Sequence, residues 1–393
     1  MTPAAAASAV AGPIAATMGN AVEDAGDTRF SGADRAFMAR ALALAARGLY
    51  TTTPNPRVGC VIARDGQTLG EGWHVHAGEA HAEVAALADA RVRGHDVRGA
   101  TLYVTLSPCN VHGRTPPCVD AIIPAGIARV VAAMRDPGAA QADGLARLSA
   151  AGIAVDVGLL EAEARDLNPG FVSRITRGRP WVRSKIAASL DGRTALASGE
   201  SQWITGTAAR EDGHAWRARA CAILTGVGTV LHDDPQLNVR AVATTRQPFK
   251  VIVDRNGEVP PGAKILAGGP SLIVTAGARN PAWPGEVDVL ALPDANARVD
   301  LHALMRELAA RGANEIHVEA GAKLNGALMQ AGLIDELLVY VAGALIGDPA
   351  RGMFELPEPL PTLAARTRLQ WKSIDRIGDD LRIVARVAAS EEV

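Results

Sequence analysis

The apolar residues after Ser31 recur every three or four positions, which predicts an amphipathic helix at the start of the ordered chain. Ser31 and Asp34 have the spacing of a capping box, so the helix is expected to begin at Ser31. The apolar positions that define this helix are Phe37, Met38, Ala41, Leu42 and Ala45.

Beyond this helix the pattern switches between strand-like and helical periods. Two strand-like runs, 58–63 and 68–73, flank Asp65-Gly66, a dipeptide typical of a hairpin turn. The remaining elements expected in the first half are a helix over 81–90, a strand over 101–106, a helix near 118–125, a strand at 128–133, a helix near 143–151, a strand at 153–156 and a single helix within 157–180.

The second half repeats this alternation without resembling the first half in sequence. Strands are expected near 181–188, 221–226, 249–254, 271–275, 315–319, 334–342 and 381–388. Helices are expected near 206–219, 300–311 and 322–331. Pro, Gly and Ala content predicts loops over 241–248, 276–300 and 349–378.

This alternation predicts an α/β protein in which helices cover both faces of each sheet. The polar, Gly- and Pro-marked stretch at 177–180 has the character of a domain boundary. We therefore expect a disordered tail over 1–30, a first domain over 31–178 and a second over 179–393. A length of 393 residues accommodates two domains, each with its own core.

Composition narrows the classes of partner. Lys and Arg number 40 against 42 Asp and Glu, for a net charge of -2, which provides no general attraction for nucleic acid or anionic membranes. No apolar run approaches the roughly 20 residues that span a bilayer, and the N-terminal segment lacks the pattern of a secretory signal. Four cysteines in a chain of this length suit a reducing compartment. We expect a cytoplasmic protein that acts on small molecules.

Three residues have the types and the order of a catalytic zinc site. His81 opens a predicted helix, and Cys109 and Cys118 follow a predicted strand, so all three can meet at one edge of the sheet. Two thiolates and one imidazole leave the fourth tetrahedral position open for water. Glu83, two positions after His81, can then move protons, since H-x-E followed by Pro-Cys and a second Cys is the signature of zinc deaminases.

Taken singly, these residues have simpler explanations. A lone His or Cys in an Ala-rich segment most often only packs, and Cys60 and Cys221 are expected to be small buried hydrophobic residues. His112 could support the zinc ligands, whereas His74 and His76 are expected in loops. The order and context of His81, Glu83, Cys109 and Cys118 together favour zinc.

With these residues in view, the chain resembles the bifunctional deaminase/reductase family of riboflavin biosynthesis from about Ala36 nearly to its end. The first half shares Thr53-Pro54-Asn55-Pro56, Val58-Gly59-Cys60, His81-Ala82-Glu83-Val84 and Gly113-Arg114-Thr115-Pro116-Pro117-Cys118. The second half shares Ser189-Leu190-Asp191-Gly192-Arg193-Thr194, Gly199-Glu200-Ser201-Gln202-Trp203-Ile204-Thr205, Asp233-Asp234-Pro235-Gln236-Leu237, Val318-Glu319-Ala320-Gly321 and Ala331-Gly332-Leu333-Ile334-Asp335-Glu336-Leu337.

The resemblance implies a cytidine-deaminase-like three-layer α/β/α domain followed by a dihydrofolate-reductase-like α/β domain. The first would bind one Zn²⁺ through His81, Cys109 and Cys118, with Glu83 as proton donor, and would deaminate 2,5-diamino-6-(5-phosphoribosylamino)pyrimidin-4-one. The second would reduce the ribosyl chain to ribityl with NADPH. The family also implies a homodimer or higher homo-oligomer formed through the reductase half.

For binding residues the resemblance implies two sets. Substrate contacts would come from Asn55, Ser201, Arg217, Leu237, Arg240 and Glu319. Cofactor contacts would come from Ala187, Trp203, Thr229, Asp233, Gly321, Ala322, Lys323, Leu324, Asn325, Gly326 and Ala327. The residue types agree with these roles, because backbone N–H groups at a helix start can hold a phosphate and guanidinium forks suit a ribotide phosphate.

Several positions depart from the family pattern. Ser107 stands where Glu usually precedes Pro-Cys, Asn110-Val111 replaces Ser-His, 138–144 lacks the usual glycine pattern, and Gly343-Ala344 stands where Pro-Lys is common. One alternative is therefore a paralogue with the same deaminase/reductase architecture that serves a toxin or modified-pterin pathway. Two others are a nucleic-acid base deaminase, which the charge balance disfavours, and a binding module with a purely structural zinc.

Overall fold

A computed structural model describes residues 28–138 and 143–388, and its contacts divide the chain into one unit up to Arg177 and another from Gly178. The predicted tail over 1–30 lies outside the described residues as far as residue 27, and so does the middle of the 138–144 loop. Within the described part of the chain, no helix is long and apolar enough to cross a membrane.

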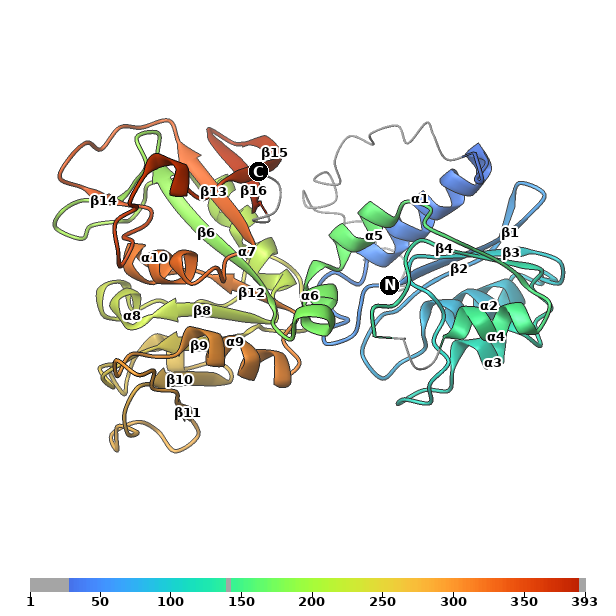
Figure 1. The fold of residues 1–393 in the computed structure, drawn as a ribbon, viewed down its shortest axis with the longest axis horizontal. Coiled ribbons are helices and arrows are strands. Elements are labelled where there is room, and N and C mark those ends of the chain that lie inside the picture. The colour runs from blue at the N-terminus through green and yellow to red at the C-terminus, as the bar shows by residue number, and fades with distance from the viewer. Residues whose placement is uncertain (1–27, 139–142, 389–393) are drawn as a thin grey trace, which may run out of the picture. The chain divides into compact units, whose positions relative to one another are not determined.

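Unit 1 is built around a five-stranded mixed sheet in the order β2-β1-β3-β4-β5 (Figure 1). The hairpin β1–β2 is antiparallel, as is the pair β1–β3, whereas β3, β4 and β5 run parallel. The strands are β1 (Gly59–Arg64), β2 (Gln67–Trp73), β3 (Thr101–Val104), β4 (Arg129–Ala132) and β5 (Ala154–Val157), and the helices are α1 (Gly32–Ala46), α2 (Ala82–Val92), α3 (Cys118–Ile122), α4 (Gly144–Ala150), α5 (Glu161–Leu167) and α6 (Pro169–Arg177).

Alternation along the strands sends neighbouring side chains into two separate cores. On β1, Cys60 and Ile62 pack with α2, α3 and α4, whereas Val61 and Ala63 pack with α1 and α5. The predicted three-layer arrangement is thus observed. Ser31 caps α1 as predicted, because its hydroxyl accepts from Asp34 N and the Asp34 carboxylate accepts from Ser31 N. The single helix expected within 157–180 is instead two helices, α5 and α6, separated at Asn168.

Unit 2 contains a nine-stranded sheet in the order β11-β10-β9-β8-β12-β6-β13-β16-β15. Its strands run parallel from β11 to β13, and β16 and β15 complete it in antiparallel orientation. The strands are β6 (Trp181–Ser189), β8 (Ala222–Gly226), β9 (Phe249–Val253), β10 (Ser271–Thr275), β11 (Asp288–Ala291), β12 (Glu315–Val318), β13 (Glu336–Ala342), β15 (Leu369–Ile377) and β16 (Asp380–Val387), with β7 (Arg193–Ala195) and β14 (Arg351–Gly352) forming a separate pair.

Two loop predictions were wrong in this unit. The segment 276–300 contains the edge strand β11, and 349–378 contains β15, a nine-residue strand. The side chains of β15 alternate between partly buried and exposed, and its hydrogen bonds come from β16, so tertiary pairing decides its conformation.

The two faces of the unit 2 sheet differ in chemistry. One face forms an apolar core with α9 (Leu301–Ala310) and α10 (Ala322–Gln330). The other carries α7 (Thr207–Arg219) and α8 (Val227–Asp233). Beside an apolar cluster next to α8, the α7 side of the central strands carries ionisable residues: Arg183 and Lys185 on β6, and Glu315 and His317 on β12. Charges buried in this way need partners, so this face is where chemistry is expected.

Candidate active sites

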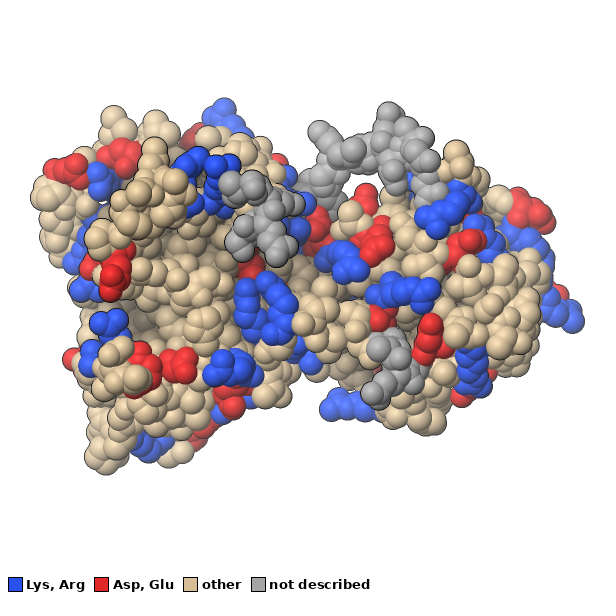
Figure 2. All heavy atoms as spheres, in the orientation of Figure 1, with Lys and Arg blue, Asp and Glu red and all other residues tan. Residues whose placement is uncertain are grey.

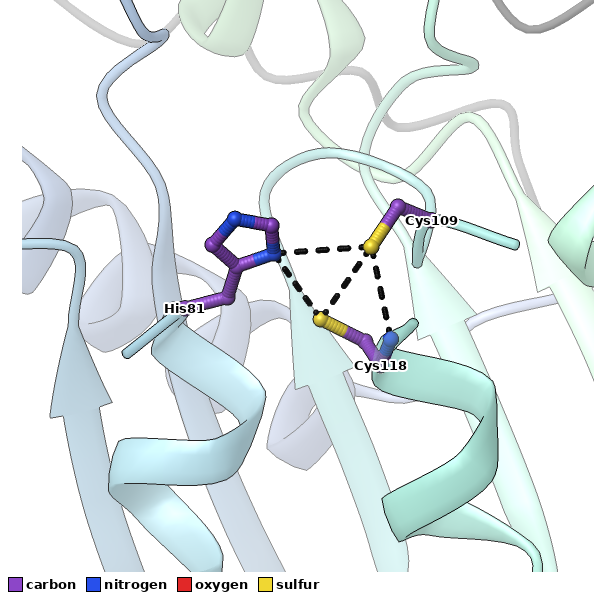
Figure 3. A group of neighbouring side chains, drawn as sticks. All are labelled: His81, Cys109 and Cys118. Atoms are coloured by element: carbon purple, nitrogen blue, oxygen red, sulfur yellow. Dashed lines mark hydrogen bonds between the residues drawn. The ribbon is translucent and has the colours of Figure 1, made fainter. Parts of the chain in front are cut away.

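Three side chains of unit 1 converge on one point beyond the end of β3 (Figure 3). The Nδ1 atom of His81 lies 3.1 Å from Cys118 Sγ and 3.4 Å from Cys109 Sγ, and the two sulfurs are 3.5 Å apart. All three ligand atoms lie within 4.8 Å of one another. The predicted metal ligands are therefore brought together.

Local structure explains this convergence. His81 is the N-cap of α2, Cys118 is the first residue of α3, and Cys109 lies in the loop between β3 and α3. The Cys118 backbone N–H donates to Cys109 Sγ at 3.3 Å, so the start of α3 also stabilises a negative sulfur. A sequence in which strands lead into helix starts thus places all the ligands at one sheet edge.

The two sulfurs differ in their acidity. Hydrogen bonds from Cys118 and His81 outweigh burial and hold the pKa of Cys109 well below the usual value of a thiol. Cys118 is raised in pKa, because its thiol donates to Cys109 and is itself buried. A bound divalent cation favours the thiolate form of both sulfurs.

Glu83 lies in the first turn of α2 and is only 3% exposed. Burial is the main cause that raises the pKa of its carboxyl, with the negative Cys109 adding to it, whereas the nearby His81 and a hydrogen bond from Cys118 oppose the rise. A buried carboxyl beside the three ligands, with a raised pKa, has the properties of a group that carries a proton between two partners.

Asn55 reaches the same centre through a residue to which the sequence gave no definite role. Asn55 Nδ2 lies 3.0 Å from His74 Nε2, and the other ring nitrogen of His74 lies 3.1 Å from Ala80 O. The His74 ring stands edge-on to His81, with centroids 5.4 Å apart, and His74 is 2% exposed. Its position directly after β2 was visible in the sequence, but its burial was not.

The departures from the family pattern in unit 1 lie in loops around Cys109. Ser107 Oγ accepts from Asp136 N at 2.9 Å, and Asn110 Oδ1 accepts from Arg147 at 2.8 Å. A Cβ added at Gly144, the first residue of α4, would lie 2.0 Å from Pro108 O. The loop that carries Cys109 is therefore packed directly against the start of α4. Val111 and His112 are exposed on the surface.

In unit 2, an ion-paired cluster lies on the face of the sheet beneath α7. Arg217 of α7 binds the Glu319 carboxylate through two nitrogens, one at 2.9 Å, and also donates to Asn238 O. Burial alone would raise the pKa of Glu319, but the charge and hydrogen bonds of Arg217 hold this pKa well below its usual value. Lys185 Nζ approaches Glu319 Oε2 at 4.0 Å.

The other residues expected to bind substrate surround this pair in part. Arg240 donates to Asn238 Oδ1, so it shares Asn238 with Arg217. Leu237 is buried with a φ of 44°. Burial and the charges of Arg217 and Arg240 lower the pKa of the nearby His214 to about 4, which keeps its ring neutral. Ser201 instead pairs with Asp233, expected to contact the cofactor, at 3.4 Å.

The expected cofactor residues fall on neighbouring strand ends. Gly321 is the N-cap of α10. Leu324 of that helix lies close to Gly226, because a Cβ added at Gly226 would be 3.4 Å from its side chain. Gly226 is in turn the N-cap of α8, the helix that contains Thr229. Glu319 N donates to Leu224 O and Thr225 Oγ1 to Glu319 O, which ties β8 to the segment before α10. Asn325 is fixed by Ser184 and Ala320. Ala187 lies instead within β6, and the exposed Trp203 is contacted by the Arg210 guanidinium.

Several polar residues of this face were missed by sequence reasoning. Lys185 and His317 occupy strand positions whose only local signal is the alternation of polar and apolar residues, and both are buried in large part. Tyr340 donates to Asp212 at 2.5 Å, and Asp212 is paired with Arg382, 170 residues away. Such pairings connect distant parts of the chain and have no local signal.

Comparison with known families matches each half. Residues 31–134 match the family model of the cytidine and deoxycytidylate deaminase zinc-binding region, and residues 180–383 match the RibD C-terminal domain. The riboflavin biosynthesis protein RibD of Escherichia coli is 48% identical over 362 residues, covering 88% of this chain and 98% of that protein. RibD of Haemophilus influenzae is 46% identical over 369 residues, covering 90% and 97%.

Solved structures agree over nearly the whole chain. Acinetobacter baumannii RibD superimposes with a TM-score of 0.82 at 42% identity, covering 91% of this chain and 99% of that one. A diaminohydroxyphosphoribosylaminopyrimidine deaminase/5-amino-6-(5-phosphoribosylamino)uracil reductase from Thermotoga maritima gives 0.83 at 33% identity with the same coverage.

Proposed function

Because the chain belongs to the RibD family of riboflavin biosynthesis, whose members join a deaminase to a reductase, we propose a specific role for each residue of the two sites. The protein is an enzyme of riboflavin biosynthesis that deaminates a pyrimidine ribotide and reduces its ribosyl chain. We assign deamination to residues 31–178 and reduction to residues 179–393.

The donor set of unit 1 fits zinc. One imidazole nitrogen and two sulfurs, all within 4.8 Å of one another, match a tetrahedral site that leaves one position open. His81, Cys109 and Cys118 would hold the zinc, which would supply Lewis acidity that lowers the pKa of water to near neutral. The remaining chemistry falls to the residues around it.

Glu83 is the proton carrier of the deamination. Its carboxylate takes a proton from the attacking water and delivers it to the 2-amino nitrogen of the pyrimidinone, which leaves as ammonia. The burial of Glu83 and its place in the first turn of α2 keep it beside the metal ligands. Asn55, whose side chain contacts His74, binds the edge of the pyrimidine ring.

In unit 2 the cluster around Arg217 binds the ribotide. Arg217 and Arg240 provide guanidinium forks for its phosphate, with Glu319, Ser201 and Leu237 as further contacts. The residues of the Gly321–Ala327 turn, with Ala187, Trp203, Thr229 and Asp233, bind a nicotinamide cofactor. Backbone N–H groups at the start of α10 suit a cofactor phosphate. We assign NADPH as that cofactor.

The test is incubation of the purified zinc-loaded chain with the diaminopyrimidinone ribotide, alone, with NADPH and with NADH, while ammonia release and product mass are followed. Ammonia without cofactor, and the ribityl product with NADPH at a much higher kcat/KM than with NADH, would support the assignment. Equal use of NADH would contradict the NADPH assignment. Absence of ammonia from the zinc-loaded protein would contradict the deaminase residues.

Similarity over almost the full length of the E. coli and H. influenzae proteins favours this role over a paralogue in another pathway. On the face drawn in Figure 2, basic and acidic side chains are interspersed, so this surface offers no broad basic field to a long polyanion. A cytoplasmic location, where thiolate ligands stay reduced, and a homo-oligomer formed through the reductase half complete the proposal.

A further inference from the structure

The His81 ring faces two different environments. Its Nδ1 atom points at the sulfurs of Cys109 and Cys118, and its other nitrogen points away from them (Figure 3). On that far side, Thr115 Oγ1 lies 3.3 Å from His81 Nε2. Within the described residues, Thr115 is the hydrogen-bond partner found for this nitrogen.

A neutral imidazole carries one N–H, so the two ring nitrogens cannot play the same role. A metal ligand must present a lone pair, which requires the proton to reside on Nε2 when Nδ1 faces the metal. A hydroxyl oxygen can accept a hydrogen bond from that Nε2–H. The partner of the outer nitrogen thereby fixes both the tautomer and the orientation of a ligating histidine.

Thr115 is held in place for this contact by its own loop. Gly113 N donates to Thr115 O, and the two prolines that follow lead directly into Cys118. Thr115 itself is partly buried, although the residues before it are exposed. The loop between Cys109 and Cys118 thus supplies two sulfurs to one side of the metal centre and a hydroxyl to the far side of the histidine.

We propose that Thr115 is a positioning residue of the metal centre, accepting a hydrogen bond from His81 Nε2–H so that Nδ1 is held toward the zinc. This inference rests on the proposed zinc site. It explains why Thr occurs inside the connection between the cysteines: the same short segment orders both halves of the ligand set.

The experiment measures zinc affinity of the full chain by competition with a chromogenic chelator. Thr115→Val keeps the shape of the side chain and removes the acceptor, and we expect zinc to bind roughly 10–100-fold more weakly. Thr115→Ser keeps the hydroxyl and should bind zinc within about threefold of the wild type. Reductase activity, carried by the other unit, and the zinc-free melting profile check that both variants fold.

Each outcome bears on one claim. Unchanged zinc affinity in Thr115→Val overturns the positioning role, and so does equal weakening in both variants, which would implicate the methyl group. Failure of the wild-type chain to bind zinc would instead contradict the proposed metal site. If Thr115→Val is misfolded, the Ser variant and Thr115→Ala, which also lacks the acceptor, replace it in the same comparison.

Discussion

The two active sites are assembled in opposite ways. The centre in unit 1 draws on four residues between positions 81 and 118: His81, Glu83 and Cys118 lie at helix starts, and Cys109 lies in the loop that leads to α3. The cluster in unit 2 draws on α7, β6 and the segment after β12, and its central pair joins residues 102 positions apart. The first site can be recognised from local sequence, whereas the second exists only once the sheet has formed.

The sites also differ in how their charges are compensated. In unit 2 the Glu319 carboxylate is matched by Arg217 and approached by Lys185, so its charge is compensated without a ligand. In unit 1 the partly buried Cys109 thiol, the buried Cys118 thiol, the His81 imidazole and the buried Glu83 carboxyl face one another, so negative charge is in excess once both thiols ionise. A cation would remove that imbalance. Unit 1 is therefore expected to depend on its metal, and unit 2 on its internal pairs.

Of the variants considered, Glu83→Gln is expected to have the largest effect on the activity of one site while leaving the other site unchanged. Loss of the proton carrier should lower deamination by roughly 10²–10⁴-fold, because that is what a positioned general acid or base contributes. Zinc content and reduction of the already deaminated ribotide should not change. Ammonia release, metal analysis and cofactor oxidation measure the three. Full deamination in this variant would mean that the zinc serves only structure.

Next in size is the loss of a charge partner in unit 2. Arg217→Met leaves Glu319 buried without its main cation, and we expect this to cost unit 2 about 3 kcal/mol and to weaken reduction. Tryptophan fluorescence during urea unfolding reports on this unit, which holds five of the six tryptophans. Arg217→Lys, which keeps the charge but not the fork, should fall between. Slower deamination in either variant would contradict the independence of the sites.

A smaller loss of stability is expected from substituting the glycine that packs tightly against the backbone near each site. A Cβ at Gly144 would lie 2.0 Å from Pro108 O, and one at Gly326 would lie 1.9 Å from Glu355 O. Each Ala substitution should cost about 1–3 kcal/mol through overpacking, Gly144→Ala weakening zinc affinity and Gly326→Ala weakening cofactor binding. Gly213→Ala, in a helix with open space around it, is the control. If Gly144→Ala weakened cofactor binding, or Gly326→Ala weakened zinc binding, the assignment of each glycine to its own site would be wrong.

The smallest effect appears only in acid and only in unit 1. Burial would raise the pKa of Asp34, but hydrogen bonds from Ser31, Tyr103 and Arg129 lower it to about 2. The stabilisation, about 2 kcal/mol, should be complete above pH 4 and be lost as the pH falls through 2.

Hydrogen exchange of α1 amides in the zinc-free chain, with wild type and Asp34→Asn compared at each pH, follows this loss. The advantage of the wild type should shrink between pH 4 and 2. An advantage that grows toward acid would mean that the sign of the shift is wrong.

Much of the fold followed from the sequence because most elements carry strong local signals. The capping box at Ser31 set the start of α1, and Asp65-Gly66, both with positive φ, made the hairpin turn. The two missed strands have one cause. The strands β11 and β15 lie at or next to the sheet edges, where burial is partial and the hydrophobic pattern is weak, so their pairing partners decide them.

Sequence by itself predicted His81, Cys109 and Cys118 as zinc ligands, because only a few residue types bind this metal and their order and spacing can be read along the chain. It also predicted Glu83 as the proton carrier and, through family resemblance, Arg217 and Glu319 as substrate contacts. Only the tertiary structure revealed the side-chain contacts of His74 with Asn55, of Thr115 with His81 and of Lys185 with Glu319. Their roles depend on burial and on distances between segments, which no local pattern encodes, since a side chain acquires its partners only when the sheets and helices pack.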